Sequence, residues 1–442
     1  MNHHLWLVSA LLTGLVLRVV ALPVAVPAVD DSWRAWSYHA AADGPARMYG
    51  PHGHTVRLGD IDAPVVYPPL ALDELGLVGR VHLWLSGGQF PNDVRLTILI
   101  KGVIALLDAA LAALIFLIVR RAAGSRTACW AAVAYWLNPA VLMTTALGYI
   151  DVCFAIPAVA AVVAASHGRA RWSGALCAAA LLTKPQGIFV APVVWLALWN
   201  SGGGETARAR VSSAIAASAI VAAVVISPMV AAGTAWYMVR SVAVLAGHDM
   251  LSGLAFNAWW IVSYLFEAAA AADQGLRAAL SASPAIVTHA YAMAHGLPQP
   301  RVIAAIAGSS ALAWALGTAR HTRDLGRHAA LAAFIVDAYF TLSVQVHENH
   351  FFLIVPLLIL ASALRREFAP VLAVLSVTFA LNLYLVFGVN GFGPPDWMIT
   401  GTGIDSTVLI AAINCGAFAW FAIVFARSCR TPVVRSVQSG VS

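Results

Sequence analysis

The sequence predicts an all-α polytopic membrane protein with about twelve transmembrane helices and a large first outer loop. Hydrophobic residues make up 61% of its 442 positions and charged residues only 10%, a balance far outside that of water-soluble domains. Uninterrupted apolar windows are long enough to cross about 30 Å of hydrocarbon as helices. Four of them are residues 5–26, 96–119, 211–232 and 407–425. The first window lacks a cleavage site followed by a polar domain, so we expect a retained span.

The arginines give the predicted spans a sidedness. Fifteen arginines fall in short turns and in the tail on one side, against only three acidic residues there. The opposite side carries fifteen acids against eight arginines. By the positive-inside rule, the arginine-rich side is cytoplasmic and so are both termini. Because this asymmetry explains the net charge of +6, the basic pI gives no reason to expect nucleic acid as a partner.

The long polar segments all fall on the outer side. We expect a first outer loop at residues 27–95 and a second at residues 233–301. Both belong to a single transmembrane catalytic domain, residues 1–426, and a cytoplasmic tail follows at residues 427–442. The cytoplasmic turns are too short for a nucleotide-binding domain, and an isolated glycine run at 202–204 is typical of a linker. We therefore expect the chemistry on the outer face.

Lysine is rare in this chain, which makes its two positions informative. Lys101 lies within a predicted span with Asp108 seven residues later, which favours a structural ion-pair network that includes Arg18. Lys184 connects two apolar runs of only 12 residues, 172–183 and 188–199, each about 18 Å long as a helix. A buried ammonium needs a carboxylate or an anionic ligand, and for Lys184 we favour anion binding.

Two clusters of polar residues on the outer side are suited to catalysis. Asp30 and Asp31 directly follow the first span, where a carboxylate could act as a general base. Acids at this place could also serve topology alone. His347, Glu348 and His350 lie at the outer end of a later span. Two histidines one turn apart could ligate a metal, but without a second ligand pair we favour hydrogen bonding to a phosphate or sugar.

These runs, taken in order, resemble the GT-C superfamily of multi-span glycosyltransferases, which use polyprenyl- or dolichyl-phosphate sugars. The acidic pair followed by Trp36 and Tyr67-Pro68-Pro69-Leu70 is similar to the first outer loop of bacterial mannosyltransferase-like members and of the endoplasmic reticulum glucosyltransferases that use dolichyl-phosphate-glucose. The remaining stretches that look like family motifs are Asn138-Pro139, Gly148-Tyr149-Ile150-Asp151, Lys184-Pro185-Gln186, Phe256-Asn257-Ala258-Trp259 and His347-Glu348. Tyr149 stands where the family commonly has glutamine.

The resemblance implies a hexosyltransferase that moves mannose or glucose from a polyprenyl-phosphate donor to a lipid or glycan acceptor, with inversion. Asp30 or Asp31 would be the catalytic base, with Asp30 favoured. The substrate-binding residues would include Lys184 and His347 at the leaving phosphate. Further substrate-binding positions are Gln186, Glu348, Asp151, Tyr67 and Asn257. Side-chain cations could balance a monophosphate leaving group, so no metal or other cofactor is expected.

Two other functions remain open on the sequence. A transporter or flippase for an anionic lipid or sugar would use buried charges such as Arg18, Lys101, Asp108 and Asp337 as its pathway. A glycan polymerase or ligase would share the outer cavity but take lipid-pyrophosphate donors. The concentration of polar residues at one face favours the transferase, and the alanine- and arginine-rich composition suggests a bacterial plasma membrane.

Overall fold

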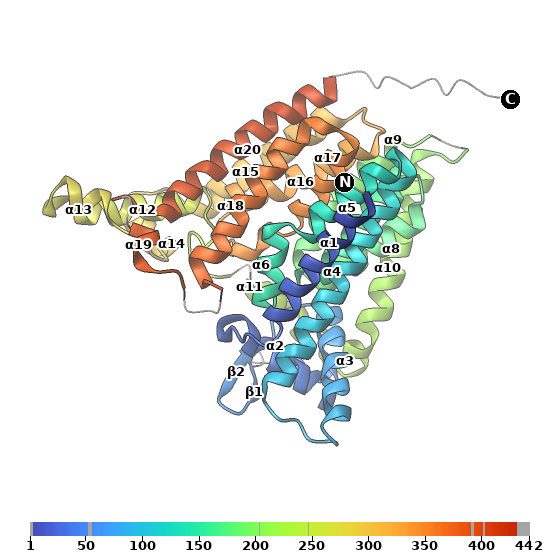
Figure 1. Cartoon of the computed structure of the whole chain (residues 1–442), viewed down its shortest axis with the longest axis horizontal. Coiled ribbons are helices and arrows are strands. Elements are labelled where there is room, and N and C mark those ends of the chain that lie inside the picture. Colours follow the sequence, from blue (N-terminus) through green and yellow to red (C-terminus); the bar gives the residue numbers. More distant parts are fainter. Residues whose placement is uncertain are drawn as a thin grey trace.

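The computed structural model describes residues 3–51, 55–202, 204–245, 247–389, 393–400 and 403–430, and most of these form helices (Figure 1). The first half contains α1 His3–Ala21, α2 Pro27–Ala42, η1 Pro45–Met48, β1 Thr55–Leu58, β2 Ile61–Pro64, α3 Pro69–Leu85, α4 Val94–Ala123, α5 Ser125–Trp136, α6 Pro139–Leu147, α7 Asp151–Ser166, α8 Ala170–Thr183, η2 Pro185–Val190, α9 Ala191–Asn200 and α10 Ala207–Ala231. The second half contains α11 Ala235–Leu245, α12 Ala258–Ala271, η3 Ala272–Gln274, α13 Leu276–Leu280, α14 His289–Ala294, α15 Pro300–Ala319, α16 Leu325–Leu342, η4 Glu348–Phe351, α17 Ile354–Leu364, η5 Arg366–Phe368, α18 Ala369–Phe387, α19 Asp396–Thr400 and α20 Ser406–Arg430.

Five helical segments within the described ranges are long and apolar enough to cross a membrane: α4, α10, α15, the run from η5 through α18, and α20. Three shorter apolar helical segments accompany them, at Leu5–Ala21, Asp151–Ser166 and Glu348–Leu364. The four predicted windows coincide with α1, α4, α10 and α20. The total of about twelve spans stays a prediction.

The first window extends too far at its C-terminal end. Residues 5–26 are predicted as one span, but α1 ends at Ala21 and α2 begins at Pro27. Pro23 accounts for the early end, because a proline disfavours helical conformation in the residue before it, Leu22.

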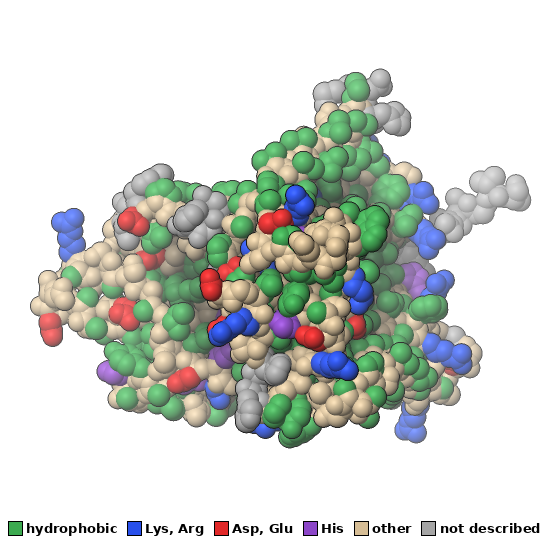
Figure 2. Space-filling model, turned by 90° about the horizontal axis from the view of Figure 1, so that it is seen from below, with side chains coloured by type: hydrophobic (Ala, Val, Ile, Leu, Met, Phe, Trp, Pro, Cys, Tyr) green, Lys and Arg blue, Asp and Glu red, His purple; other side chains and the backbone are tan. Residues whose placement is uncertain are grey.

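The predicted first outer loop is a folded subdomain. It contains α2 and α3, which pack against each other, and an antiparallel hairpin in which Thr55 pairs with Pro64. The subdomain lies at one end of the molecule (Figure 1). Viewed from that end, charged and histidine side chains lie in the middle of the face among hydrophobic ones, and further basic side chains lie along its rim (Figure 2). α1 begins and α20 ends on the opposite side (Figure 1).

Side-chain bonds connect the turns that carry the predicted cytoplasmic arginines. The Asn200 amide donates to the carbonyl of Thr322 at 3.1 Å, which joins the turn after α9 to the turn before α16. Arg365, in the turn after α17, forms an ion pair with Asp324 at 2.5 Å. These three turns therefore lie close together, while the sidedness of the whole chain stays a prediction. The tail from 431 to 442, with Arg435, lies outside the described residues.

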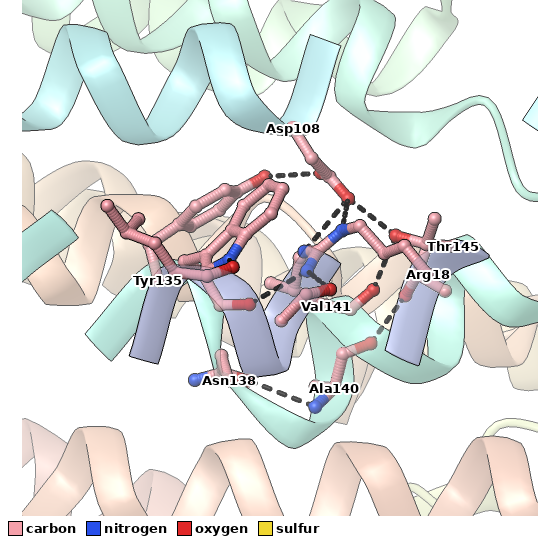
Figure 3. Close-up of polar contacts among 11 residues, drawn as sticks. Arg18, Asp108, Tyr135, Asn138, Ala140, Val141 and Thr145 are labelled. Carbon is pink, nitrogen blue, oxygen red and sulfur yellow. Dashed lines mark hydrogen bonds and ion pairs between the residues drawn. The ribbon is translucent and has the colours of Figure 1, made fainter. Parts of the chain in front are cut away.

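The buried ion pair predicted for the first spans is present between α1 and α4 (Figure 3). Arg18 Nε lies 3.2 Å from Asp108 Oδ2. The hydroxyls of Tyr135 and Thr145 donate to the same carboxylate at 2.8 and 2.5 Å. Both charged side chains are almost completely buried, and the carboxylate has donors at both oxygens. This network holds α1 against α4, α5 and α6.

The inclusion of Lys101 in that network is wrong. Its ammonium donates to backbone carbonyls instead, namely those of Val24 and Ala146, the latter at 2.5 Å. Backbone carbonyls at the C-terminal end of a helix lack intrahelical partners. The lysine therefore donates hydrogen bonds to carbonyls just after α1 and near the end of α6. Asp337, one of the charges that the transporter alternative would use, accepts a hydrogen bond from Thr341 of its own helix at 3.3 Å.

Candidate active site

A cavity of about 820 Å³ lies between α2, η2, the end of α16 and η4, next to the turn before α7. Aromatic side chains line one wall, and they include Trp33, Trp36 and Tyr67. The three rings contact one another with centroids 5.1 to 5.5 Å apart. Aromatic walls with a few polar groups are typical of small-molecule sites.

The segment around Lys184 lies at this site because α8 ends early and the short helix η2 follows it. α8 ends at Thr183, where Lys184 turns to an extended conformation before Pro185. Gly187 lets η2 fold back against α8, since a Cβ there would lie only 2.3 Å from the carbonyl carbon of Ala180. The two short predicted spans are thus separate short helices, and the connection between them lies inside the protein.

Lys184 is paired inside the protein. Its Nζ lies 2.5 Å from Asp151 Oδ1, and the two side chains are 2% and 1% exposed. Asn349 donates to the other carboxylate oxygen at 3.1 Å. Gly148 makes this geometry possible, because its left-handed conformation, with φ of 87°, ends α6 just before Asp151 begins α7.

Neither member of this pair lines the cavity; the ring of Tyr67 does, and Lys184 Nζ lies 5.6 Å from its centre. The counterion of Lys184 in the structure is therefore a carboxylate. Its ammonium thus lies next to the ring of Tyr67, which is one of the aromatic residues of the cavity wall.

Glu348 and Tyr149 form the polar part of the cavity wall. Both line the cavity, and the Tyr149 hydroxyl donates to Glu348 Oε1. Glu348 is 4% exposed, so the tyrosine replaces water as its donor. Tyr149 occupies the position at which the GT-C superfamily, which the sequence resembles, commonly has glutamine.

His347 lines the cavity as well, and burial is the main reason that its pKa is lowered to about 4. The neighbouring His248, with a ring centroid 6.0 Å away, lowers the pKa further, as does Lys184. The imidazole is consequently neutral near pH 7. It can offer a phosphate a hydrogen bond, but not the positive charge that its sequence position suggests.

The two predicted catalytic carboxylates lie beside the cavity, on α2. The cavity-facing residues of this helix are Val29, Ser32, Trp33 and Trp36. At about 100° per residue, Asp30 lies on the flank of that face and Asp31 on the far side. Neither one lines the cavity itself.

Asp30 is held on that flank by α4. The Thr97 hydroxyl donates to its Oδ2 at 2.6 Å, and Arg34 Nε lies 3.8 Å away. Its other oxygen, Oδ1, is buried without a hydrogen-bond partner among the described residues. Burial raises the pKa of Asp30, and to that extent opposes its ionised form. Burial also raises the pKa of Asp31, which is only partly buried.

Gln186 and Asn257 have contrasting surroundings. Gln186 lines the cavity, and its Oε1 is buried with no hydrogen-bond partner among the described residues. Asn257 does not line the cavity. Its Oδ1 accepts from the backbone of Trp259 and Trp260 at the start of α12, and its amide donates to the carbonyl of Phe340. All these contacts serve the fold.

The cavity also contains residues that sequence reasoning missed, among them His248, Gln345 and Tyr339. Backbone bonds bring the first two together: Gln345 donates to the carbonyl of Leu251, and Gly253 to that of Val346. Tyr339 contacts His350, with its hydroxyl 3.0 Å from Nδ1. An isolated histidine or glutamine in a predicted loop carries no pattern, so the sequence had no signal for them.

No group of three or more His, Cys, Asp or Glu side chains in the described part of the chain is placed to hold a metal ion. His347 and His350, the pair considered as metal ligands, instead contact each other edge to face, with centroids 5.5 Å apart.

Comparison with known proteins adds little beyond this geometry. No family model matches the sequence, and no curated protein matches it. Among solved structures, the chain is similar to ArnT from Cupriavidus metallidurans in the apo state, at 14% sequence identity and a TM-score of 0.40. That match covers 95% of this chain and 78% of the other.

Proposed function

We propose that this protein is a glycosyltransferase that transfers a hexose from a polyprenyl-phosphate donor to a lipid or glycan acceptor on the outer face of the membrane. The observation that carries the proposal is the single cavity that brings Tyr67, Tyr149, Gln186, His347 and Glu348 together. These residues come from four of the runs that resemble the GT-C superfamily, and they are far apart in the sequence.

The polar groups of the cavity suit a phosphate next to a sugar. Lys184 contributes positive potential next to the ring of Tyr67. The carboxylate of Asp151 compensates part of this charge. Gln186 and the neutral His347 can each hydrogen bond to a phosphate or hydroxyl. Glu348 can accept from sugar hydroxyls while Tyr149 holds it in place. Aromatic rings such as Trp33 offer apolar faces to a sugar or to the first isoprene units.

The reaction would be one displacement at the anomeric carbon. The acceptor oxygen forms the new bond to that carbon as the bond to the phosphate oxygen breaks, and the lipid phosphate leaves with the bonding pair. The hydroxyl proton passes to a carboxylate, for which we propose Asp30, because this residue flanks the cavity-facing side of α2 and its Oδ1 has no partner among the described residues. Asp31, on the far side of α2, is the alternative base.

The transporter and polymerase alternatives have less support. Three of the four charges that a transport pathway would use, Arg18, Asp108 and Lys101, bond to one another or to backbone, so they are occupied as structural contacts. The fourth, Asp337, accepts from Thr341 of its own helix. A lipid-pyrophosphate donor would bring a second phosphate, and the cavity lining contains no lysine or arginine within the described residues. We place the protein in a bacterial plasma membrane with both termini cytoplasmic.

The test is sugar transfer by purified protein in liposomes with labelled polyprenyl-phosphate-mannose or polyprenyl-phosphate-glucose and a membrane lipid extract. Wild type, Asp30→Asn and Asp31→Asn are compared, with the exposed Asp60→Asn as control. We expect Asp30→Asn to lose about 10²- to 10⁴-fold in turnover while donor binding is kept. If wild type transfers neither sugar but moves labelled lipid between leaflets, the protein is a carrier. Transfer from pyrophosphate donors alone would indicate a polymerase.

A further inference from the structure

On the arginine-rich side, a groove of about 510 Å³ opens between α5 and the α17, η5 and α18 segment, remote from the cavity. Arg126 and Arg366 line it together with the hydroxyl residues Thr127 and Ser362. Apolar side chains make up most of the remaining lining, with Ile359 the largest on the α17 side. The groove thus has two cations and an apolar floor.

Several groups in the groove lack a partner that a ligand anion could provide. Arg126 and Arg366 are exposed, and neither guanidinium forms an ion pair or hydrogen bond within the described ranges. Ser362 Oγ is buried without a hydrogen-bond partner among the same residues. α5 begins after Gly124, so no side chain at the N-cap accepts from the N–H groups of its first turn.

The groove continues from these cations into the depth of the membrane. From Arg126 to Ala134, which also lines it, α5 advances eight residues, or about 12 Å. Trp130 lies between them on the groove, 55% exposed, and stacks on Trp6 of α1 with centroids 4.3 Å apart. Exposed tryptophans of this kind mark the boundary between headgroups and hydrocarbon.

We propose that this groove binds an anionic glycerophospholipid. The phosphate lies against Arg126 and Arg366, and the first part of an acyl chain follows α5 past Trp130 toward Ala134. Basic pockets between membrane helices bind acidic lipid headgroups for the same reasons of charge and depth. Free phosphate would use the cations but leave the apolar floor uncovered. This proposal does not depend on the reaction proposed for the cavity.

The test is native mass spectrometry of delipidated protein in detergent, titrated with dioleoyl phosphatidylglycerol or dioleoyl phosphatidylcholine. Wild type should prefer the anionic lipid, and the double variant Arg126→Gln, Arg366→Gln should bind it about thirtyfold more weakly. The matched control is Arg171→Gln, Arg208→Gln, which removes the same charge from exposed arginines of the same side that do not line this groove. It should stay within about twofold of wild type.

A second variant keeps the charge and fills the groove. Ala134 is exposed and small, so Ala134→Phe should weaken phosphatidylglycerol binding about tenfold with both arginines intact. Equal affinity for the two lipids in wild type, or unchanged phosphatidylglycerol binding in both the arginine variant and Ala134→Phe, would overturn the proposal. Complete displacement of the lipid by millimolar inorganic phosphate would overturn it too, because the site would then be one for the free anion.

Discussion

The pair of Lys184 and Asp151 allows a quantitative test of how the site is held together. Both side chains are at most 2% exposed and their charged atoms are 2.5 Å apart. Removing one member of a buried pair leaves an uncompensated charge and costs about 3–5 kcal/mol. We therefore expect Asp151→Asn and Lys184→Met each to lower the free energy of unfolding by about that amount.

The double variant should behave differently, because no orphaned charge remains in it. With both Asp151→Asn and Lys184→Met, Asn349 can still donate to the new amide oxygen. The double variant should thus be no less stable than either single one. The coupling energy would then be at least as large as the cost of one single variant, about 3 kcal/mol or more, which is at or above the upper end of the range of about 0.5–3 kcal/mol known for residues in contact.

The assay is unfolding in mixed micelles with increasing sodium dodecyl sulfate, followed by circular dichroism and tryptophan fluorescence. Asp60→Asn serves as control, because Asp60 is exposed in the hairpin turn and should change stability by less than about 0.5 kcal/mol. If the losses of the two single variants simply add in the double variant, the pair is not coupled. The reasoning from burial and distance would then be refuted.

Four further outcomes are expected. Tyr149→Phe removes the donor to Glu348, a bond to a charged group worth about 1.5–3 kcal/mol, and should lower transfer about 10- to 100-fold; unchanged kcat/KM would exclude a role for this bond. Activity that depends on ionised Asp30 should fall as pH decreases through a pKa that burial raises above its ordinary value, and Arg34→Gln, which removes a charge that lowers this pKa, should move the acid limb of the pH–rate profile to higher pH; a shift to lower pH would contradict the assignment. Asp108→Asn should lower thermal stability while the folded protein keeps its transfer rate, whereas a carrier would lose flux. Finally, transfer should be insensitive to EDTA, and strict metal dependence would count against the roles given to the side chains.

Much of the helical framework could be predicted, because long apolar runs have few alternatives in a membrane. α4, α10 and α20 fall where their windows lie. The first span was predicted too long, since hydropathy continues past Pro23 while the backbone does not. The folding of residues 27–95 into two helices and a hairpin was not predicted, because short amphipathic elements in a loop have weak periodicity.

The candidate site could be predicted in its residues but less well in its contacts. The importance of Lys184 follows from the scarcity of lysine, yet its partner Asp151 is 33 positions away and depends on how α7 packs on α8. The pairing of Tyr149 with Glu348 crosses 199 positions. Asn257 resembles a family motif, but its side chain caps α12. Such long-range contacts are set by tertiary packing, which one sequence alone does not reveal.

The two buried ion pairs have different consequences for biosynthesis. Lys184 and Asp151 lie in consecutive helices, so a ribosome delivers both to the insertion machinery almost together, and the α7–α8 hairpin can enter lipid already neutralised. Arg18 precedes Asp108 by 90 residues. The arginine in the last turn of α1 therefore lacks its carboxylate partner, at a cost of up to about 3 kcal/mol, until α4 is synthesised. The ion pair that stabilises α1 in its final position thus forms only after α4 has been synthesised.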